Sequence, residues 1–358
     1  MKTQIFYHKR PMFGLDIGSQ TIKFLQLDAH QNKASVKAYG SIATDQKIMK
    51  SGVVTNVSKA AELVDSLLSK HCKGALTTNR VVMSIPVSHV FTRVLSLPIM
   101  SKKELDSAMQ IEVEQSVPIA AKNLYFDYET TNSGDSGDVL VRLVAAPRAI
   151  VDSYVDVCDL LGLDIALIQT NIRADAQLCM RYEDLTPNSP YIIIDVGGDS
   201  IDVGILDATL RVTGTVEEGG NSLTEAIARE LHVSQVKANA VKVKQGLNSG
   251  AQQDKIKKAV KPILDKVLLE IRRMIRFYKE RVREDCEITQ ILIVGGGANM
   301  PGLGDYLTND TRIPSRVSSP WGSHISFNKI EPPEHVNLPR FLTCAGLALA
   351  KEDEALSL

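Results

Sequence analysis

Residues 16–28, DIGSQTIKFLQLD, and residues 195–207, DVGGDSIDVGILD, share the pattern D-(I/V)-G-x-x-(S/T)-I-x-x-x-x-L-D. Each copy follows a short apolar run typical of a buried strand, and each precedes another extended stretch and then a helical one, over residues 58–70 and 222–231. Two widely spaced copies are too few for a solenoid. The repeat therefore predicts an α/β fold of two duplicated lobes, with one hairpin of each lobe facing a shared cleft.

The tips of both hairpins are suited to binding phosphate groups. Phosphate binding needs backbone N–H groups that approach the anion closely, which glycine or a small residue at a tight turn allows. We expect Asp16 and Asp195, each at the end of a buried strand, to hold Mg²⁺, because hard cations prefer carboxylate oxygens, and Lys23 to neutralise phosphate charge. The phosphate contacts expected at the two tips are Gly18, Ser19, Gln20, Gly197, Gly198, Asp199 and Ser200.

A third glycine-rich segment, ILIVGGGANMPGL at residues 291–303, reads as a buried strand that opens into a turn and then a helix. Its glycines allow the backbone to contact a flat ring or a sugar, which predicts a seat for adenosine. The residues expected there are Gly295, Gly296, Gly297, Ala298 and Met300. Gly219 and Gly220, which begin another helix in the same lobe, are also expected to contact the nucleotide. No glycine is followed by lysine, so a Walker A loop is excluded.

Composition excludes several other classes of protein. The 358 residues are 44% apolar and carry a net charge of -1, which gives no overall attraction to nucleic acid or to an anionic membrane. The five cysteines form no CxxC pair and no HExxH occurs, so the common zinc and disulfide frameworks are absent. No segment approaches 18 uninterrupted apolar residues, so we expect a cytoplasmic protein with no direct membrane insertion.

Residues 254–284 form one long predicted helix with eleven Lys or Arg and five acidic residues. An RNA-binding surface and a solvated helix face are both compatible with this charge. The second interpretation is favoured because no aromatic platform accompanies the cations.

Residues 87–163 are predicted to form a small inserted α+β subdomain. A helix begins at Ser101 with a capping box to Glu104, two strands flank the polar turn at residues 132–138, and a helix follows over residues 149–161. The predicted first lobe comprises residues 11–86, 164–188 and a terminal helix at 341–352. The predicted second lobe comprises residues 189–340, with a helical subdomain at 215–288 that contacts nucleotide.

The three glycine motifs stand in the order and spacing of the phosphate 1, phosphate 2 and adenosine motifs of the actin-like ATPase superfamily. Within it the chain resembles the type IV pilus assembly family PilM over nearly its whole length, most clearly at residues 97–101, 112–119, 126–128 and 217–224. The resemblance implies a duplicated actin-like (ribonuclease H-like) two-lobe ATPase fold with an inserted small α+β subdomain, in the branch that includes the cell-division protein FtsA.

This resemblance also implies a function: a cytoplasmic scaffold of pilus assembly that binds ATP and Mg²⁺. The scaffold would be peripheral at the inner membrane through the cytosolic N-terminal tail of a PilN-like bitopic protein. Other pilus assembly proteins and further copies of the chain are additional expected partners, and nucleic acid is not. The apolar residues Val117, Pro118 and Ile119 at a helix exit would line a groove for the tail, unless they only close the core of their own subdomain.

Three further positions are carried over from the superfamily. Asp175 stands where many members place a longer glutamate that orients water for ATP hydrolysis, so any turnover should be slow, and whether ATP is hydrolysed stays open. Asn239 and Lys242 stand in the helix that lies near the adenine in the family.

Three alternatives remain. A small-molecule kinase of this fold would need a base beside the acceptor hydroxyl, which the sequence does not offer convincingly. A filament-forming protein like FtsA predicts a basic amphipathic helix at the C-terminus, whereas residues 351–358 are acidic and short. A component of a type II secretion platform is the third alternative.

Overall fold

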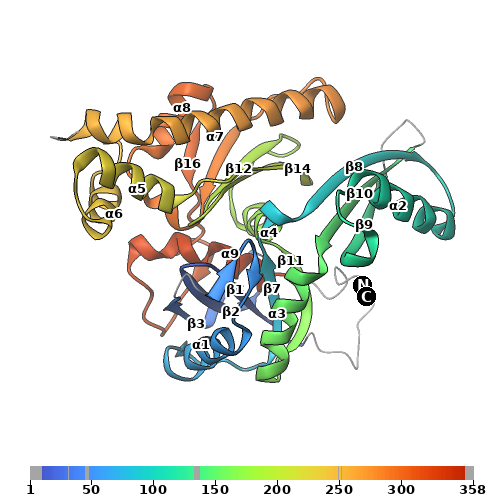
Figure 1. Ribbon diagram of the computed structural model, residues 1–358, viewed down its shortest axis with the longest axis horizontal. Helices are drawn as coiled ribbons and strands as arrows, with labels where there is room; N and C mark the ends of the chain where they lie inside the picture. The colour runs from blue at the N-terminus through green and yellow to red at the C-terminus, as the bar shows by residue number, and fades with distance from the viewer. Residues whose placement is uncertain are drawn as a thin grey trace.

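The computed structural model describes residues 10–30, 32–44, 48–132, 138–248, 250 and 252–350. Two lobes lie one above the other in Figure 1, with helices α4 (Asn171–Tyr182) and α9 (Leu342–Leu347) between them. Most of the predicted turn at 132–138, the acidic end at 351–358 and the last two residues of the predicted terminal helix lie outside the described residues.

A seven-stranded sheet forms the first lobe, in the order β11-β7-β1-β2-β3-β17, with β6 paired to β3. Strands β1, β2 and β3 form an antiparallel meander, and β7 runs parallel to β1. The strands are β1 (Phe13–Ile17), β2 (Thr21–Ala29), β3 (Ala34–Ala43), β6 (Lys73–Gly74), β7 (Arg80–Ile85), β11 (Asp164–Thr170) and β17 (Ile325–Ser326). A small pair, β4 (Met49–Lys50) and β5 (Val53–Val54), precedes helix α1 (Val57–Lys70).

The second lobe repeats this arrangement in a five-stranded sheet of order β14-β13-β12-β15-β16. Again three strands form an antiparallel meander and a fourth, β15, runs parallel to the first, β12. The strands are β12 (Tyr191–Val196), β13 (Ile201–Asp207), β14 (Thr209–Val216), β15 (Gln290–Val294) and β16 (Ser315–Val317). Every residue of β12 is buried, as the apolar run Tyr191–Ile194 requires at the centre of a covered sheet, and this burial includes Asp195. The shared topology confirms the predicted duplication.

Helices cover the second sheet and supply most of its core. Along α7 the buried residues recur at helical spacing, so one side of this helix closes the core and the other faces outward. The helical elements of this lobe are α5 (Gly220–Leu231), α6 (Gln235–Lys244), α7 (Gln253–Arg281), the short η5 (Gly296–Asn299) and α8 (Leu303–Thr311). The segment η6 (His335–Phe341) leads from this lobe into α9.

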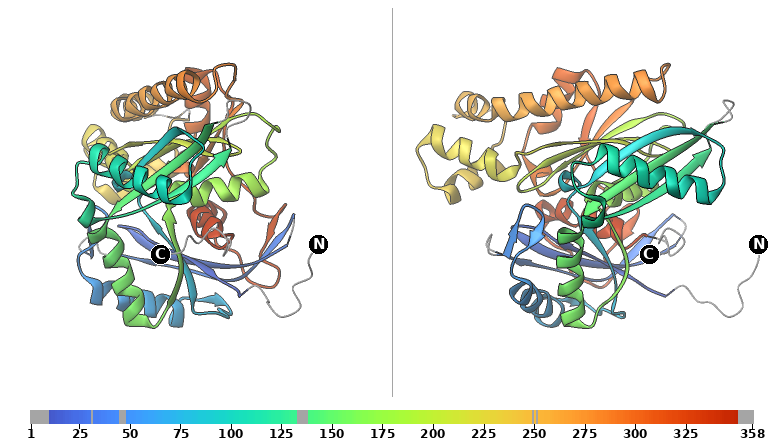
Figure 2. Two further views of the ribbon diagram at one scale, coloured as in Figure 1. Left: turned by 90° about the vertical axis from the view of Figure 1, so that its right-hand side faces the viewer. Right: turned by 45° about the vertical axis from the view of Figure 1, so that its right-hand side comes forward.

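The inserted subdomain stands to one side of both lobes (Figure 1; Figure 2). Its sheet has the order β8-β10-β9, and α2 packs on it through a separate small core. The predicted capping box is present, with Ser101 and Glu104 each satisfying a backbone N–H of the other. The elements are η2 (Val87–His89), β8 (Phe91–Pro98), α2 (Lys102–Ser116), η3 (Ala121–Asn123), β9 (Leu124–Asn132) and β10 (Asp138–Pro147).

Two predicted boundaries need correction. Helix α3 (Arg148–Leu161), predicted inside the insertion, buries Ile150, Tyr154 and Val157 in the core of the first lobe, against β1, β7 and α1. The apolar face of α3 therefore belongs to that lobe, and the insertion ends with β10. Similarly β17, predicted within the second lobe, pairs with β3 of the first.

Helix α9 seals the first lobe through close backbone contacts. A Cβ atom at Gly14 of β1 would lie 2.2 Å from the Cys344 carbonyl oxygen, and one at Gly346 would lie 2.0 Å from the Ala174 carbonyl oxygen of α4. Only glycine permits this spacing. Among the described residues, no helix combines the length and apolar character needed to cross a bilayer.

Candidate functional site

The first hairpin joins β1 to β2, and Asp16 lies near the carboxyl end of β1. The Gly18 N–H donates to the Thr21 carbonyl oxygen at 3.1 Å, which closes a tight turn. Lys23, directly across the hairpin, holds Nζ 2.6 Å from Asp16 Oδ2, and Ser84 donates to Asp16 Oδ1 at 2.8 Å. Burial alone would lower the pKa of Lys23, but the Asp16 charge raises it. Lys23 therefore neutralises Asp16 in this structure.

The second hairpin has the same turn, with the Gly197 N–H donating to the Ser200 carbonyl oxygen at 3.0 Å. Its Asp195 occupies the position of Asp16. The residue across the strand pair is Asp202, where the first hairpin has Lys23. The second hairpin thus carries two carboxylates in place of an ion pair.

Asn171, the first residue of α4, bridges these two carboxylates. Its Nδ2 lies 2.8 Å from Asp195 Oδ2 and 2.9 Å from Asp202 Oδ2, while its Oδ1 accepts from the Val87 N–H at 2.9 Å. Thr215 also donates to Asp202 Oδ1 at 2.7 Å. The amide fixes both carboxylates but supplies no positive charge.

This pair of carboxylates is electrostatically unbalanced. Burial, and then the charge of Asp202, raises the pKa of Asp195 to about 7. Burial also raises the pKa of Asp202, and hydrogen bonds from Asn171 and Thr215 offset only part of the effect. The arrangement favours a bound proton or a cation, and oxygen ligands of this kind suit Mg²⁺. Among the described residues, no group of three or more His, Cys, Asp or Glu side chains is placed to hold a metal.

The tips of the two hairpins face each other. Gln20 of the first tip donates to Asn221, and Asn221 donates to Asp199 of the second tip at 2.8 Å. A Cβ atom at Gly198 would lie 3.6 Å from Gln20 Cγ and 3.7 Å from Ser19 Oγ. The structure therefore brings together the residues predicted from the two repeats, in a closed arrangement of the lobes.

The start of α5 packs directly on the second tip. A Cβ atom at Gly219 would lie 2.5 Å from the Gly198 carbonyl oxygen, and the Gly220 N–H donates to the Gly197 carbonyl oxygen at 2.8 Å. Lys242 of α6 donates to the Gly220 carbonyl oxygen at 2.8 Å. Burial, and then the charge of Arg340, lowers the pKa of Lys242 to about 8. Asn239, one turn earlier on α6, is exposed.

The glycine turn after β15 passes beneath Asp195. Gly295 has φ +83°, and a Cβ atom there would lie 2.1 Å from Asp195 Oδ1, while one at Gly297 would lie 2.2 Å from Val196 Cγ1. The backbone at Gly296 instead faces Arg340 of η6, whose Cγ would lie 3.4 Å from an added Cβ atom. The third motif thus lies beside the second hairpin, and its role as a seat for adenosine stays a prediction.

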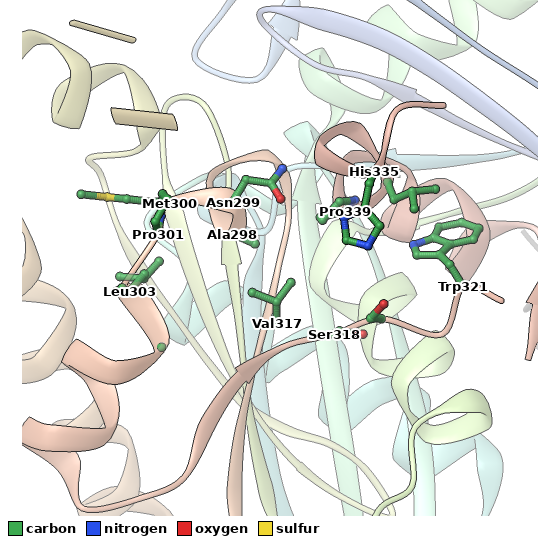
Figure 3. A pocket seen from close by; sticks show the side chains of 14 residues that line it. Ala298, Asn299, Met300, Pro301, Leu303, Val317, Ser318, Trp321, His335 and Pro339 are labelled. Carbon is green, nitrogen blue, oxygen red and sulfur yellow. The ribbon is translucent and has the colours of Figure 1, made fainter. Parts of the chain in front are cut away.

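A cavity of about 300 Å³ lies next to this turn, between η5, α8, β16 and η6. Figure 3 shows Asn299, Leu303, Val317, His335 and Trp321 around it. Ala298 and Met300, predicted to contact nucleotide, also line this cavity, and both are buried in the core of the second lobe.

Asp175 lies one turn deeper in α4 than Asn171 and is fully buried. Burial, and then the Asp195 charge, raises its pKa well above the usual value, with only partial compensation from the Thr343 hydroxyl. Asn171, and not Asp175, is the α4 residue that touches the carboxylate pair. The predicted role of Asp175 in hydrolysis stays a prediction.

The predicted partner-binding segment lies at the exit of α2. Val117 is 8% exposed and packs in the core of the insertion, whereas Pro118 is exposed and Ile119 is half-buried. Val117 also lines a cavity of about 120 Å³ beside the edge strand β8. The other residues that line it are Phe91, Thr92, Arg93, Ser116, Leu143 and Ala145.

Comparisons with known proteins are consistent with this geometry. A family model described as type IV pilus assembly protein PilM matches residues 14–352. A solved PilM-PilN type IV pilus biogenesis complex matches with a TM-score of 0.80 at 22% identity, over 96% of this chain and 98% of that chain. MreB 5 of Spiroplasma citri bound to AMPPNP matches with a TM-score of 0.55 at 12% identity, over 95% of each chain. These likenesses confirm the predicted actin-like fold.

Among curated proteins, the type II secretion system protein L of Xanthomonas campestris pv. campestris is 29% identical over 87 residues. The match spans 23% of this chain and 23% of that protein, so it covers less than a quarter of the relative's length.

Proposed function

Because the chain belongs to the type IV pilus assembly protein PilM family, we propose that it is an ATP-binding scaffold of that assembly machinery. It binds the cytosolic N-terminal tail of a PilN-like membrane protein, and through that tail it is held at the inner membrane. The observation that carries the nucleotide part is the pair Asp195 and Asp202 of the second hairpin, bridged by Asn171 and close to the facing tip of the first hairpin. The observation that carries the docking part is the cavity beside β8.

The residues present fit Mg²⁺ with a phosphate chain. Asp195 and Asp202 are buried side by side, and a divalent cation would balance a charge that the protein itself leaves uncompensated. Asp16 already has Lys23 as a counter-ion, so the second hairpin would carry more of the metal binding than the first. Gly18 and Gly197 place no side chain between the backbone of either turn and a bound anion.

Titration calorimetry with Mg²⁺ and ATP tests this assignment. Asp195→Asn keeps the size of the side chain but removes the negative charge, and we expect the affinity to fall about tenfold or more. Asp28→Asn is the matched control, because Asp28 ends the first copy of the repeat at the far end of β2 and is only half-buried. Equal affinity in both variants would remove Asp195 from the metal site.

The groove for the tail lies along β8. Among the residues that the structure describes, β8 pairs with β10 alone, so its other edge can add an extended peptide through main-chain hydrogen bonds. The adjacent cavity of about 120 Å³ can take one apolar side chain of that peptide. Val117 also lines this cavity, but it packs in the core of the insertion. Because aspartate at that position would disrupt this core, Val117 is a poor site for a test.

Phe91 and Phe126 are better sites for testing where the tail docks. Both pair with Ala145, from opposite edges of the same sheet, and their exposed fractions are 37% and 38%. Only Phe91 lines the cavity. We expect Phe91→Ser to weaken binding of a synthetic tail peptide about tenfold, measured by fluorescence anisotropy, with Phe126→Ser changing it less than twofold. The reverse order would place the docking surface on β9.

Nucleotide and tail are linked through the first turn of α4. Asn171 contacts the carboxylate pair, and Arg173, two residues later, pairs with Glu129 of the insertion at 2.6 Å. A movement of the second hairpin relative to α4 therefore reaches the insertion through a few direct contacts. This route lets the nucleotide state influence assembly, and it requires no rapid hydrolysis.

A type II secretion platform is the second candidate, favoured by the 87-residue likeness to secretion protein L. Copurification from membranes distinguishes the two, because the bitopic partner recovered would belong to one machine or the other.

A further inference from the structure

The outward face of α7 carries cations around exposed apolar residues. Leu269 is 67% exposed and Phe277 is 48% exposed, although both belong to a helix whose opposite side closes the core. We name as the basic stripe the residues Leu269, Arg272, Arg273, Arg276 and Phe277, which recur at spacings of three, four, seven and eight and so share one face. Figure 1 shows the C-terminal half of α7 along the outer edge of the second lobe.

The charge of this helix is concentrated and only partly compensated. Residues 254–284 have eleven basic and five acidic residues, an excess of six, whereas the whole chain has a net charge of -1. Arg272 lies 3.5 Å from Asp310, and Arg273 lies 2.6 Å from Glu270. Arg276, Lys279 and Arg281 have no ion pair within the described part of the chain. The free cations therefore cluster at the end of α7 that also carries Phe277.

We infer that the basic stripe contacts the surface of a bilayer that contains anionic lipid. Exposed apolar side chains on a cationic helix face are typical of helices that lie in a membrane interface. No residue of α7 lines either of the two cavities described above. A flat anionic surface satisfies both the cations and the two apolar side chains.

This contact goes beyond the proposed function and does not depend on it. It uses none of the residues assigned to nucleotide or to the tail, and it would orient the scaffold once the tail has brought it to the membrane.

Sedimentation of the full chain with vesicles tests the inference. We expect binding to vesicles of phosphatidylglycerol and phosphatidylcholine, little binding to phosphatidylcholine alone, and loss of binding in high salt. Each exposed cation contributes roughly fivefold, so Arg273→Gln with Arg276→Gln should weaken binding about 25-fold. Leu269→Gln should weaken it further without changing the salt dependence.

Lys102→Gln with Lys103→Gln is the matched control. These lysines are exposed in the first turn of α2, and their loss removes the same charge from another surface. The control should change vesicle binding less than twofold. Equal effects of the two double variants, or no binding by the unmodified chain, would overturn the inference. Tighter binding to a single-stranded RNA homopolymer than to anionic vesicles, lost in the α7 variant, would assign the stripe to nucleic acid instead.

Discussion

Arg173 of α4 and Glu129 of β9 form an ion pair in which Nη2 and Oε1 lie 2.6 Å apart. Glu129 also contacts Arg142 of β10, and Arg142 donates to the Leu210 carbonyl oxygen of β14 at 3.0 Å. Burial alone would raise the pKa of Glu129, but the charges of Arg142 and Arg173 lower it. One carboxylate thus joins the insertion to the linking helix and, through Arg142, to the second lobe.

Glu129→Gln should uncouple the nucleotide and tail sites. In the unmodified chain we expect saturating tail peptide to change the affinity for Mg²⁺ and ATP by about fivefold or more, a typical coupling between sites. The variant should reduce that change to less than twofold, because a neutral amide cannot hold two guanidinium groups. Calorimetry with and without peptide measures both values. Glu114→Gln on the exposed side of α2 is the control, and an equal loss of coupling there would refute the proposed route.

Gly295→Ala should abolish nucleotide binding and also destabilise the folded protein. The new methyl group would lie 2.1 Å from Asp195 Oδ1 and the residue would keep φ +83°, so Asp195 must move. We expect the free energy of unfolding to fall by about 3 kcal/mol or more, because the backbone is strained and the carboxylate is displaced. Gly322→Ala isolates the strain, because Gly322 has φ +84° with open space around its Cα. That control should cost about 1 kcal/mol and leave ATP binding intact. Similar melting temperatures for the two variants would contradict the predicted clash.

Asp175→Asn should become more stabilising as pH rises. The folded state raises the pKa of Asp175 well above its unfolded value, so the folded state binds more protons, and stability is lost as pH rises from the unfolded pKa through the folded one. Asparagine cannot ionise and therefore avoids this loss. Urea unfolding of both proteins between pH 5 and pH 8 measures the difference, with Asp156→Asn on the exposed side of α3 as the control. Parallel curves for the variant and the unmodified chain would refute it.

The parts of the site that could be predicted are those encoded in short contiguous patterns. Asp16 and Asp195 end apolar strands that precede glycine turns, and local geometry alone places both at hairpin tips. Because the two hairpins have the same sequence pattern, two similar lobes that face each other across a cleft could be predicted from the repeat alone. Asp202 could have been found in the same way, since it occupies in the second repeat the position that Lys23 has in the first.

Other residues reach the site only through tertiary packing. Asn171 lies at the start of a helix whose entry into the site depends on how β11 pairs, and Arg340 arrives from an irregular segment far along the chain. No spacing in the sequence indicates either contact. Helix α3 follows β10 directly along the chain, yet its buried residues pack in the core of the first lobe, and no local pattern indicates that change of lobe.

The packing of α9 against β1 has a consequence for how the chain is made. The surface beneath Gly14 is covered by residues around Cys344, which are synthesised more than three hundred positions later. During translation β1 must therefore keep an apolar face uncovered until α9 has been synthesised. Vectorial synthesis can complete the inserted subdomain early, since its core lies within residues 95–145. The first lobe is therefore completed later than the inserted subdomain, and a product truncated before α9 would leave the surface beneath Gly14 uncovered.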